Sequence, residues 1–254
     1  MDSAQDTLDR IERERAYHNE RFTEETRQAE GKFYFAIKDG ATAFSDRVSE
    51  LAVGARVLEY GCGNASQARA LARVAKSVDG IDISDVAIAE ASEIAKAEGL
   101  TNFRFQTMNA EAMTFEQGSF DLIFGRGIIH HLDLKRSFAE LARVLAPGGS
   151  VLLWEPLGHN LAINAYRAVT PSARTPDEHP LLAKDFNLAR GYFDDVGLKF
   201  YGLTSLATVP VRDTNLGEKL LRASAAVDQA LFRVPGMKWQ AWYTLIELRK
   251  PRHG

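Results

Sequence analysis

The sequence has few of the features that point to a secreted or membrane protein. It contains a single cysteine, Cys62, so no disulfide can form within the chain, as is usual in a reducing compartment. No apolar run approaches the roughly 18–20 residues that a membrane helix needs. The first residues are too highly charged for a signal peptide. We therefore expect a cytoplasmic protein without a membrane partner.

The chain also lacks an excess of basic residues. Its 31 Lys and Arg residues are outnumbered by 34 Asp and Glu residues, which gives a formal net charge of −3. Nucleic-acid-binding proteins usually present a strongly basic face, so we expect no nucleic-acid partner. What remains is an ordinary globular composition, 45% hydrophobic and 26% charged, over 254 residues. That length accommodates one large α/β domain.

Apolar patterning predicts alternating strands and helices in the middle of the chain. Helical patterns separate five short, β-rich runs at residues 55–61, 77–84, 102–108, 119–127 and 150–156. This alternation is typical of right-handed βαβ units, which build a parallel sheet with helices on both faces. An aromatic, alternating run near the end of the chain predicts a final strand at residues 238–250.

We interpret residues 1–254 as one domain in three parts, because no internal repeat or linker divides them. Residues 1–53 are charged and helical, with a first amphipathic helix followed by two short helical segments, each closed by a glycine. Residues 54–156 form the core of alternating strands and helices. Residues 157–254 add a long, proline-punctuated segment and the final strands.

The stretch VLEYGCGNAS (57–66) places a carboxylate just ahead of two glycines, where a strand ends. Gly61 and Gly63 permit a tight turn that brings backbone N–H groups within reach of a ligand. The helix expected from Ala65 has a positive N-terminal end, which favours a carboxylate or phosphate. Ligands of open α/β sheets bind beyond the carboxyl ends of the strands. This turn is therefore the first candidate site.

Two acids indicate which ligand suits the turn. Asp82 ends the second strand about 20 residues later, the spacing at which an acid binds ribose hydroxyls. On its own, Asp82 also fits a helix cap, since Ser84 and Asp85 follow it. Glu59 would repel a pyrophosphate but suits an ammonium or sulfonium group. A nicotinamide dinucleotide is thus disfavoured. The sequence also lacks the third glycine of the dinucleotide-binding fingerprint.

Five motifs in order resemble class I S-adenosylmethionine (SAM)-dependent methyltransferases, especially the branch of the ubiquinone and menaquinone enzymes. They are LEYGCGNA, GIDIS, MNAEAM, FDLIFGRGIIHHL and LAPGGSVLLWEP, within residues 55–156. Ala65 replaces the last glycine of the first motif. The resemblance implies a doubly wound, Rossmann-like, mostly parallel sheet of seven strands, with an antiparallel last strand and helices on both faces. It also implies SAM as the cofactor, S-adenosylhomocysteine as the product, and residues 1–53 as a helical lid.

The resemblance further implies which residues contact the cofactor. Glu59, Gly61 and Gly63 would hold the methionine portion of SAM. The other implied contacts are Asp82 at the ribose, Asn109 and Ala110 at the adenine, Gly125 over the methionine end, and Tyr17 and Tyr34 from the lid. An alternative for Asn109 is a purely local role as the cap of a short turn.

Methyl transfer from a sulfonium needs alignment in a dry pocket, and a hydroxyl acceptor adds the need for a base. His130 and His131 follow the fourth strand, where the resemblance places the acceptor. A side chain with a pKa near 6.5 suits base chemistry, so we predict His131, with His130 beside it, as catalytic. Alternatively, the pair only packs and hydrogen-bonds at a helix start. We expect no metal.

Four residues are candidates for binding the acceptor. Glu155 closes the fifth strand at the same rim, where it binds the acceptor or hydrogen-bonds the following loop. His159, Arg167 and Arg174 lie in the proline-punctuated segment, which is typical of a binding loop. The two arginines could fork onto a carboxylate or phosphate, or remain on a solvated surface.

The sequence favours O-methylation of a hydroxyl or carboxylate on a small-molecule natural product or a peptide. The runner-up is C-methylation of a quinone-like or other small molecule. An alternative from another class is a non-catalytic SAM-binding regulatory protein. A nucleic-acid methyltransferase is disfavoured because GRGI stands where such enzymes carry N-P-P-[YF]. The final strand could pair with another subunit, so a homodimer is a further expectation.

Overall fold

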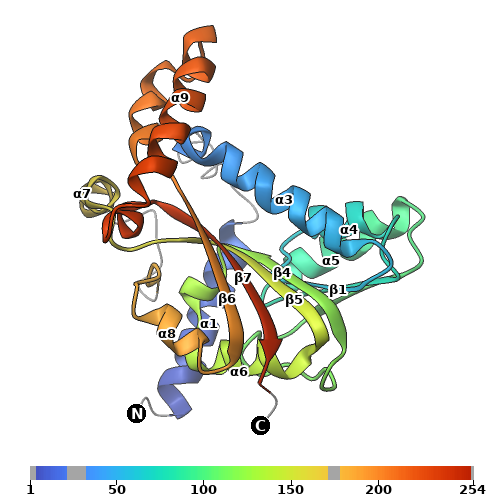
Figure 1. The fold of residues 1–254 in the computed structure, drawn as a ribbon. Helices are drawn as coiled ribbons and strands as arrows, with labels where there is room; N and C mark the ends of the chain where they lie inside the picture. Colours follow the sequence, from blue (N-terminus) through green and yellow to red (C-terminus); the bar gives the residue numbers. More distant parts are fainter. Residues whose placement is uncertain (1–3, 22–32, 171–177, 253–254) are drawn as a thin grey trace.

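A seven-stranded sheet forms the centre of the computed structural model, which describes residues 4–21, 33–170 and 178–252 (Figure 1). The strand order is β3-β2-β1-β4-β5-β7-β6. The strands are β1 (Arg56–Tyr60), β2 (Ser77–Asp82), β3 (Phe103–Thr107), β4 (Phe120–Arg126), β5 (Leu145–Pro156), β6 (Phe193–Tyr201) and β7 (Tyr243–Pro251). The first five strands pair in parallel, and β7 is antiparallel to both of its neighbours. The predicted fold class is therefore confirmed.

Helices cover both faces of the sheet (Figure 1). On one face, α3 (Lys38–Ala52), α4 (Ser66–Leu71) and α5 (Asp85–Ala97) share an apolar cluster with β1 and β2. On the other face lie α6 (Leu134–Val144) and α8 (Asp185–Ala189). In α6, the buried Leu134, Phe138 and Leu141 recur at three- and four-residue steps, so one stripe of the helix meets the sheet.

The remaining helical elements lie outside these two layers or at their edges. They are α1 (Ala4–Arg21), η1 (Phe35–Ile37), η2 (Ile129–His131), α7 (Leu161–Val169), η4 (Thr204–Val211), α9 (Asn215–Leu231) and η5 (Met237–Gln240). Helix α9 extends away from the sheet, and the end of β7 lies on the opposite side of the molecule (Figure 1). Among the described residues, none of the helices has the length and apolarity to cross a membrane.

Gly40 does not end a helix, although the sequence suggested two short helices each closed by a glycine. It lies inside α3, directly after η1. A Cβ atom at this position would lie 2.4 Å from the Trp154 ring and 2.6 Å from the Tyr201 ring. The glycine therefore allows α3 to approach β5 and β6 closely, and packing explains it better than helix termination does.

The last strands also differ in extent from their predicted bounds. Strand β5 begins at Leu145 rather than at residue 150, because Leu145 pairs with Phe120 ahead of an irregularity in the β4–β5 ladder. Strand β7 begins only at Tyr243, since the preceding residues form η5. The parallel pairing of β1 with β2 and β4 is unaffected, and it brings the carboxyl ends of these strands to one edge of the sheet, where such sheets bind ligands.

Candidate active site

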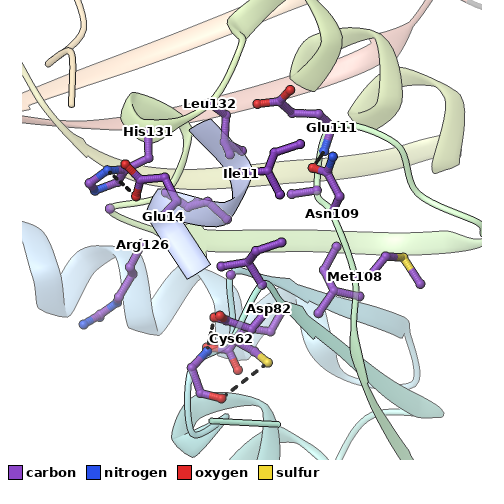
Figure 2. A pocket seen from close by; sticks show the side chains of 18 of the residues that line it. Ile11, Glu14, Cys62, Asp82, Met108, Asn109, Glu111, Arg126, His131 and Leu132 are labelled. Atoms are coloured by element: carbon purple, nitrogen blue, oxygen red, sulfur yellow. Dashed lines mark hydrogen bonds and ion pairs between the residues drawn. The ribbon is translucent and has the colours of Figure 1, made fainter. Parts of the chain in front are cut away.

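A cavity of about 370 Å³ opens at the carboxyl ends of β1, β2 and β4, and α1 contributes to its wall (Figure 2). Six of the predicted cofactor residues line it: Glu59, Gly61, Gly63, Asp82, Asn109 and Ala110. The parallel register explains the grouping, since Glu59 of β1 pairs with Gly80 of β2 and Phe124 of β4. The glycine turn and the acid of the second strand thus share one cavity.

The turn after β1 depends on a left-handed backbone. Gly61 has φ +72° and Gly63 has φ +51°. A Cβ atom on Gly61 would lie 2.3 Å from the side chain of Ile128, so this position is also closed sterically. Ala65 has φ +53° where the resembling family has its last glycine, which costs a non-glycine residue roughly 1–2 kcal/mol. The backbone of the motif is therefore kept even where its glycine is replaced.

Glu59 is a carboxyl group with little access to water. Its Oε2 accepts the backbone N–H of Ala68 in the first turn of α4, at 3.0 Å. Burial raises the pKa of Glu59 to about 8, and this hydrogen bond and the charge of Arg126 oppose the shift. Arg126 also lines the cavity, and burial lowers the pKa of its guanidinium. A desolvated carboxyl beside the turn fits the ammonium or sulfonium group of SAM and does not fit a phosphate.

Asp82 connects β2 to the glycine turn. Its Oδ2 accepts the backbone N–H of Gly63 at 2.7 Å, and its Oδ1 accepts that of Ser84 at 2.9 Å. Each oxygen keeps a second lone pair, which can accept from ribose hydroxyls. The cap of α5 is Ser84, whose side chain accepts from Ala87. Asp82 therefore has a role beyond a helix cap.

Asn109 makes the predicted local turn contact and also lines the cavity. Its side-chain carbonyl accepts the backbone N–H of Glu111 at 2.9 Å, which is the local turn contact. Its side chain also lines the cavity, next to the backbone of Ala110. The amide group of Asn109 is thus held in a fixed position on the wall opposite His131 (Figure 2).

Helix α1 is fixed over the cavity by polar contacts at both ends. Arg10 donates to the carbonyl of His131 at 3.0 Å and to the buried Glu111 at 2.5 Å. Farther along the helix, Asn19 donates to Asp85 at 3.0 Å. Between them, Glu14 points at His131, with its Oε2 3.4 Å from Nδ1 (Figure 2). Helix α1 thus closes one side of the cavity.

Arg10, Glu14 and Arg126 were missed in the sequence analysis. Arg10 and Glu14 belong to a highly charged helix in which the polar face gives no sign of what it covers. Arg126 lies within the quoted fourth-strand motif, and its position at the end of a parallel strand was the available signal. Each of the three lines the cavity.

Glu155 and His130 form a buried pair beside the cavity. The fully buried Glu155 accepts the backbone N–H groups of Ile128 and Ile129 at 2.9 and 3.2 Å, and its Oε2 lies 2.7 Å from Nδ1 of His130. Burial raises the pKa of Glu155 and lowers that of His130. These hydrogen bonds go to the turn after β4, and not to the loop after β5 that the sequence suggested.

The other predicted site residues lie outside the cavity lining. Tyr17 lies on α1, and Tyr34 stacks on Trp242 with ring centroids 5.7 Å apart. Gly125 lies within β4, where a Cβ atom would lie 2.6 Å from the carbonyl oxygen of Tyr60, so packing of the strands alone requires a glycine there.

The predicted acceptor residues are dispersed beyond the cavity. Nε2 of His159 accepts the backbone N–H of Ala183 at 3.1 Å, which fixes a loop. Arg167 lies half-buried in α7. Arg174 lies outside the described residues. Of the two predicted catalytic histidines, His131 lines the cavity and His130 lies behind it.

Comparison with known proteins identifies the core. Residues 57–149 match a methyltransferase domain family. The chain is 36% identical over 99 residues to the uncharacterised methyltransferase YcgJ of Bacillus subtilis, which is 39% of each chain. It is 33% identical over 139 residues to the aklanonic acid methyltransferase DauC of Streptomyces sp. strain C5, 53% of this chain and 60% of that one. The matches thus span 39% and 60% of the lengths of these relatives.

A solved structure supports the fold. The chain superimposes on phosphoethanolamine N-methyltransferase 2 of Haemonchus contortus, solved with phosphomonomethylethanolamine and S-adenosylhomocysteine, with a TM-score of 0.62. The match covers 84% of this chain and 53% of that one at 20% identity, so it shows the fold alone. The domain match and the curated relatives support a class I SAM-dependent methyltransferase core in this chain, and the solved structure agrees in fold.

Proposed function

We propose that this chain transfers the methyl group of SAM to an oxygen atom, a hydroxyl or carboxylate, on a small-molecule natural product or a peptide. The observation that carries the proposal is the position of His131. It lies on the wall of the cavity that also holds Glu59 and Asp82, on the side away from Asn109 (Figure 2). A proton-accepting side chain therefore lies within the space in which a methyl group would be transferred.

Different residues of the cavity suit different parts of the SAM molecule. Glu59 would hold the methionine ammonium group, and Asp82 the ribose hydroxyls. Asn109 and Ala110 would contact the adenine. The missed residue Arg126, near Glu59, would pair with the methionine carboxylate. SAM supplies an electrophilic methyl group on a positively charged sulfur, so the chain itself has only to align the acceptor and exclude water.

Helix α1 supports the exclusion of water. From this helix Arg10 reaches Glu111 and Glu14 reaches His131, two residues on different sides of the cavity. A lid fixed in this way would shield the transferring methyl group and would open for product release. The half-buried Arg167, with Arg174, remains a proposed contact for an anionic group on the acceptor.

Oxygen is preferred over carbon as the acceptor atom because a hydroxyl acceptor must lose a proton, and His131 in the cavity wall could accept it. The name of DauC describes an acid as the acceptor of that enzyme, while the solved relative acts on a nitrogen atom. C-methylation of a quinone-like molecule remains the second candidate, and a non-catalytic SAM-binding protein the third. We further propose a cytoplasmic location, no nucleic-acid partner and a homodimer.

The test uses methyl-labelled SAM and a panel of phenols, alcohols and carboxylic acids, with His131→Asn compared against His159→Asn. If methyl transfer to an alcohol or phenol is lost in His131→Asn but kept in His159→Asn, the result supports O-methylation with His131 as the proton acceptor. Transfer that mild base releases as methanol supports the carboxylate form. Label found only on carbon or nitrogen would overturn the oxygen assignment.

A further inference from the structure

Behind the wall of the cavity, two histidines and a glutamate come together from distant parts of the chain. One ring nitrogen of His130, one of His131 and a carboxylate oxygen of Glu178 all lie within 4.8 Å of one another. His130 is buried, while His131 and Glu178 are partly accessible, so the cluster is open on one side. The backbone N–H of His179 donates to the carbonyl of His130 at 2.8 Å, which holds the segment of Glu178 against the histidines.

Both histidines are oriented in the same way. Nδ1 of His130 lies 2.7 Å from the carboxylate of Glu155, and Nδ1 of His131 lies 3.4 Å from that of Glu14. Glu155 is fully buried, and Glu14 is only 6% exposed. Histidines that bind a metal ion usually give their other ring nitrogen to a carboxylate in this manner, which fixes the ring and its tautomer. In His130 the contact of Nδ1 with Glu155 leaves Nε2 as the donor atom of that ring, and His131 offers one ring nitrogen within the same 4.8 Å cluster.

We propose that His130, His131 and Glu178 form a binding site for a divalent first-row transition-metal ion, with positions left open for an oxygen atom of the methyl acceptor. Two imidazoles and one carboxylate suit Zn²⁺, Fe²⁺, Co²⁺ or Mn²⁺ and disfavour Mg²⁺, which prefers oxygen ligands. Metal–ligand distances are about 2.0–2.2 Å, so the three donor atoms need to approach one another slightly, and the partly exposed Glu178 is free to rotate inward.

This inference rests on the proposed oxygen acceptor and refines the role of His131. Because His131 also lines the cavity, a metal ion bound to its ring would lie at the boundary between the cofactor and the acceptor. The ion would hold the acceptor through its oxygen atom and lower the pKa of a hydroxyl bound there, as metal ions do for bound water. The histidine would then act on the acceptor through the metal rather than as a free base.

The site is tested on protein without a histidine tag, freed of metal with EDTA and titrated with Zn²⁺ by calorimetry. We expect one equivalent of Zn²⁺ to bind, and Glu178→Gln to weaken its affinity by about tenfold or more. Glu116→Gln, which removes one negative charge at an exposed position, should bind as the wild type does. Substoichiometric binding, or equal affinities in wild type and Glu178→Gln, would overturn the site.

Two further measurements separate this inference from the proposed function. Co²⁺ should give visible bands of nitrogen and oxygen ligation, whereas an intense near-ultraviolet thiolate band would place the metal at Cys62 and overturn the assignment. SAM binding should be the same in Glu178→Gln and wild type. If the EDTA-treated enzyme retains full methyl transfer, the role of the metal fails while the proposed function stands. If metal binds as expected but no acceptor is methylated, the metal site stands while the proposed function fails.

Discussion

The carboxylate of Asp82, at the end of β2, accepts the backbone N–H of Gly63 from the turn after β1, at 2.7 Å. One side chain thus connects two parallel strands at the edge where the cavity opens. Its other oxygen accepts the backbone N–H of Ser84. The same carboxylate would bind the ribose, so it shapes the turn and contacts the cofactor at once.

Replacing this carboxylate by an amide tests both roles. An Asn side chain has one acceptor oxygen, so Asp82→Asn satisfies only one of the two backbone N–H groups and loses the charge-assisted acceptor for the ribose. We expect SAM affinity to fall by about tenfold or more, which corresponds to roughly 1.4 kcal/mol. Calorimetric titration with SAM measures the change. An Asp82→Asn protein that binds SAM as tightly as wild type would contradict the placement of the ribose.

Glu59 makes the stability of the ligand-free protein depend on pH. Its pKa is about 8 in the folded chain against an ordinary value of 4.5, so between these values the folded state holds a proton that the unfolded state has released. The free energy of unfolding must therefore fall as pH rises from about 5 to 8. In Glu59→Gln this part of the decline should vanish. Urea unfolding at several pH values compares the two slopes, and identical slopes would refute the assignment.

SAM binding should be linked to the same proton. The positive charges of SAM favour ionised Glu59, so binding near pH 7 should release a proton in the wild type. Calorimetry in two buffers with different ionisation enthalpies measures the number of protons released. That number should be smaller in Glu59→Gln. An equal release from both proteins would show that the proton comes from another group.

Arg10 fixes the lid through a partner that is 5% exposed, Glu111. In Arg10→Ala the carboxylate of Glu111 loses its charged hydrogen-bond donor, which typically costs about 1–3 kcal/mol. We expect this cost to weaken the packing of α1 against the cavity. We expect SAM to dissociate faster and α1 to be cleaved more readily by protease. Arg15→Ala is the matched control, because Arg15 pairs with Glu12, an exposed residue of the same helix. Equal dissociation rates in both variants would argue against the lid.

Gly40 tests the packing of α3 on the sheet. A methyl group there meets two aromatic rings at 2.4 and 2.6 Å, so Gly40→Ala should destabilise the fold by about 1–3 kcal/mol. Gly197→Ala provides the control, since its nearest neighbour would lie at 3.6 Å. Thermal unfolding compares the two variants. A melting temperature for Gly40→Ala at or above that of Gly197→Ala would contradict the close approach of the helix.

The strand motifs predicted the cofactor side of the site because parallel strands bring their carboxyl ends together regardless of distance along the chain. Glu59 and Asp82 could therefore be placed in one cavity from their positions at strand ends alone. Ala65 shows the limit of motif matching. Its backbone adopts the left-handed conformation that glycine favours, which the residue type does not reveal.

The acceptor side was not predictable in the same way. Glu178 meets His130 and His131 because residues 178–181 lie beside the end of β5, where Leu181 bridges Leu157 directly after the strand. Glu14 reaches His131 from a helix near the start of the chain. Neither contact follows a strand register or a helical period, so the sequence offered no spacing from which to infer them. Gly40 looked like a helix end for a similar reason, since its aromatic neighbours lie on distant strands.

The most direct test of the proposed function is to incubate the protein with SAM carrying a ¹³C-labelled methyl group and fractionated small molecules and peptides, and then to record the carbon spectrum of the product. The chemical shift of the transferred methyl carbon identifies the atom that received it. The account predicts a methoxy signal, as an ether or an ester, that is weaker in Asp82→Asn when SAM is not saturating. A methyl group on carbon, nitrogen or sulfur, or SAM that binds and is never consumed, would contradict it.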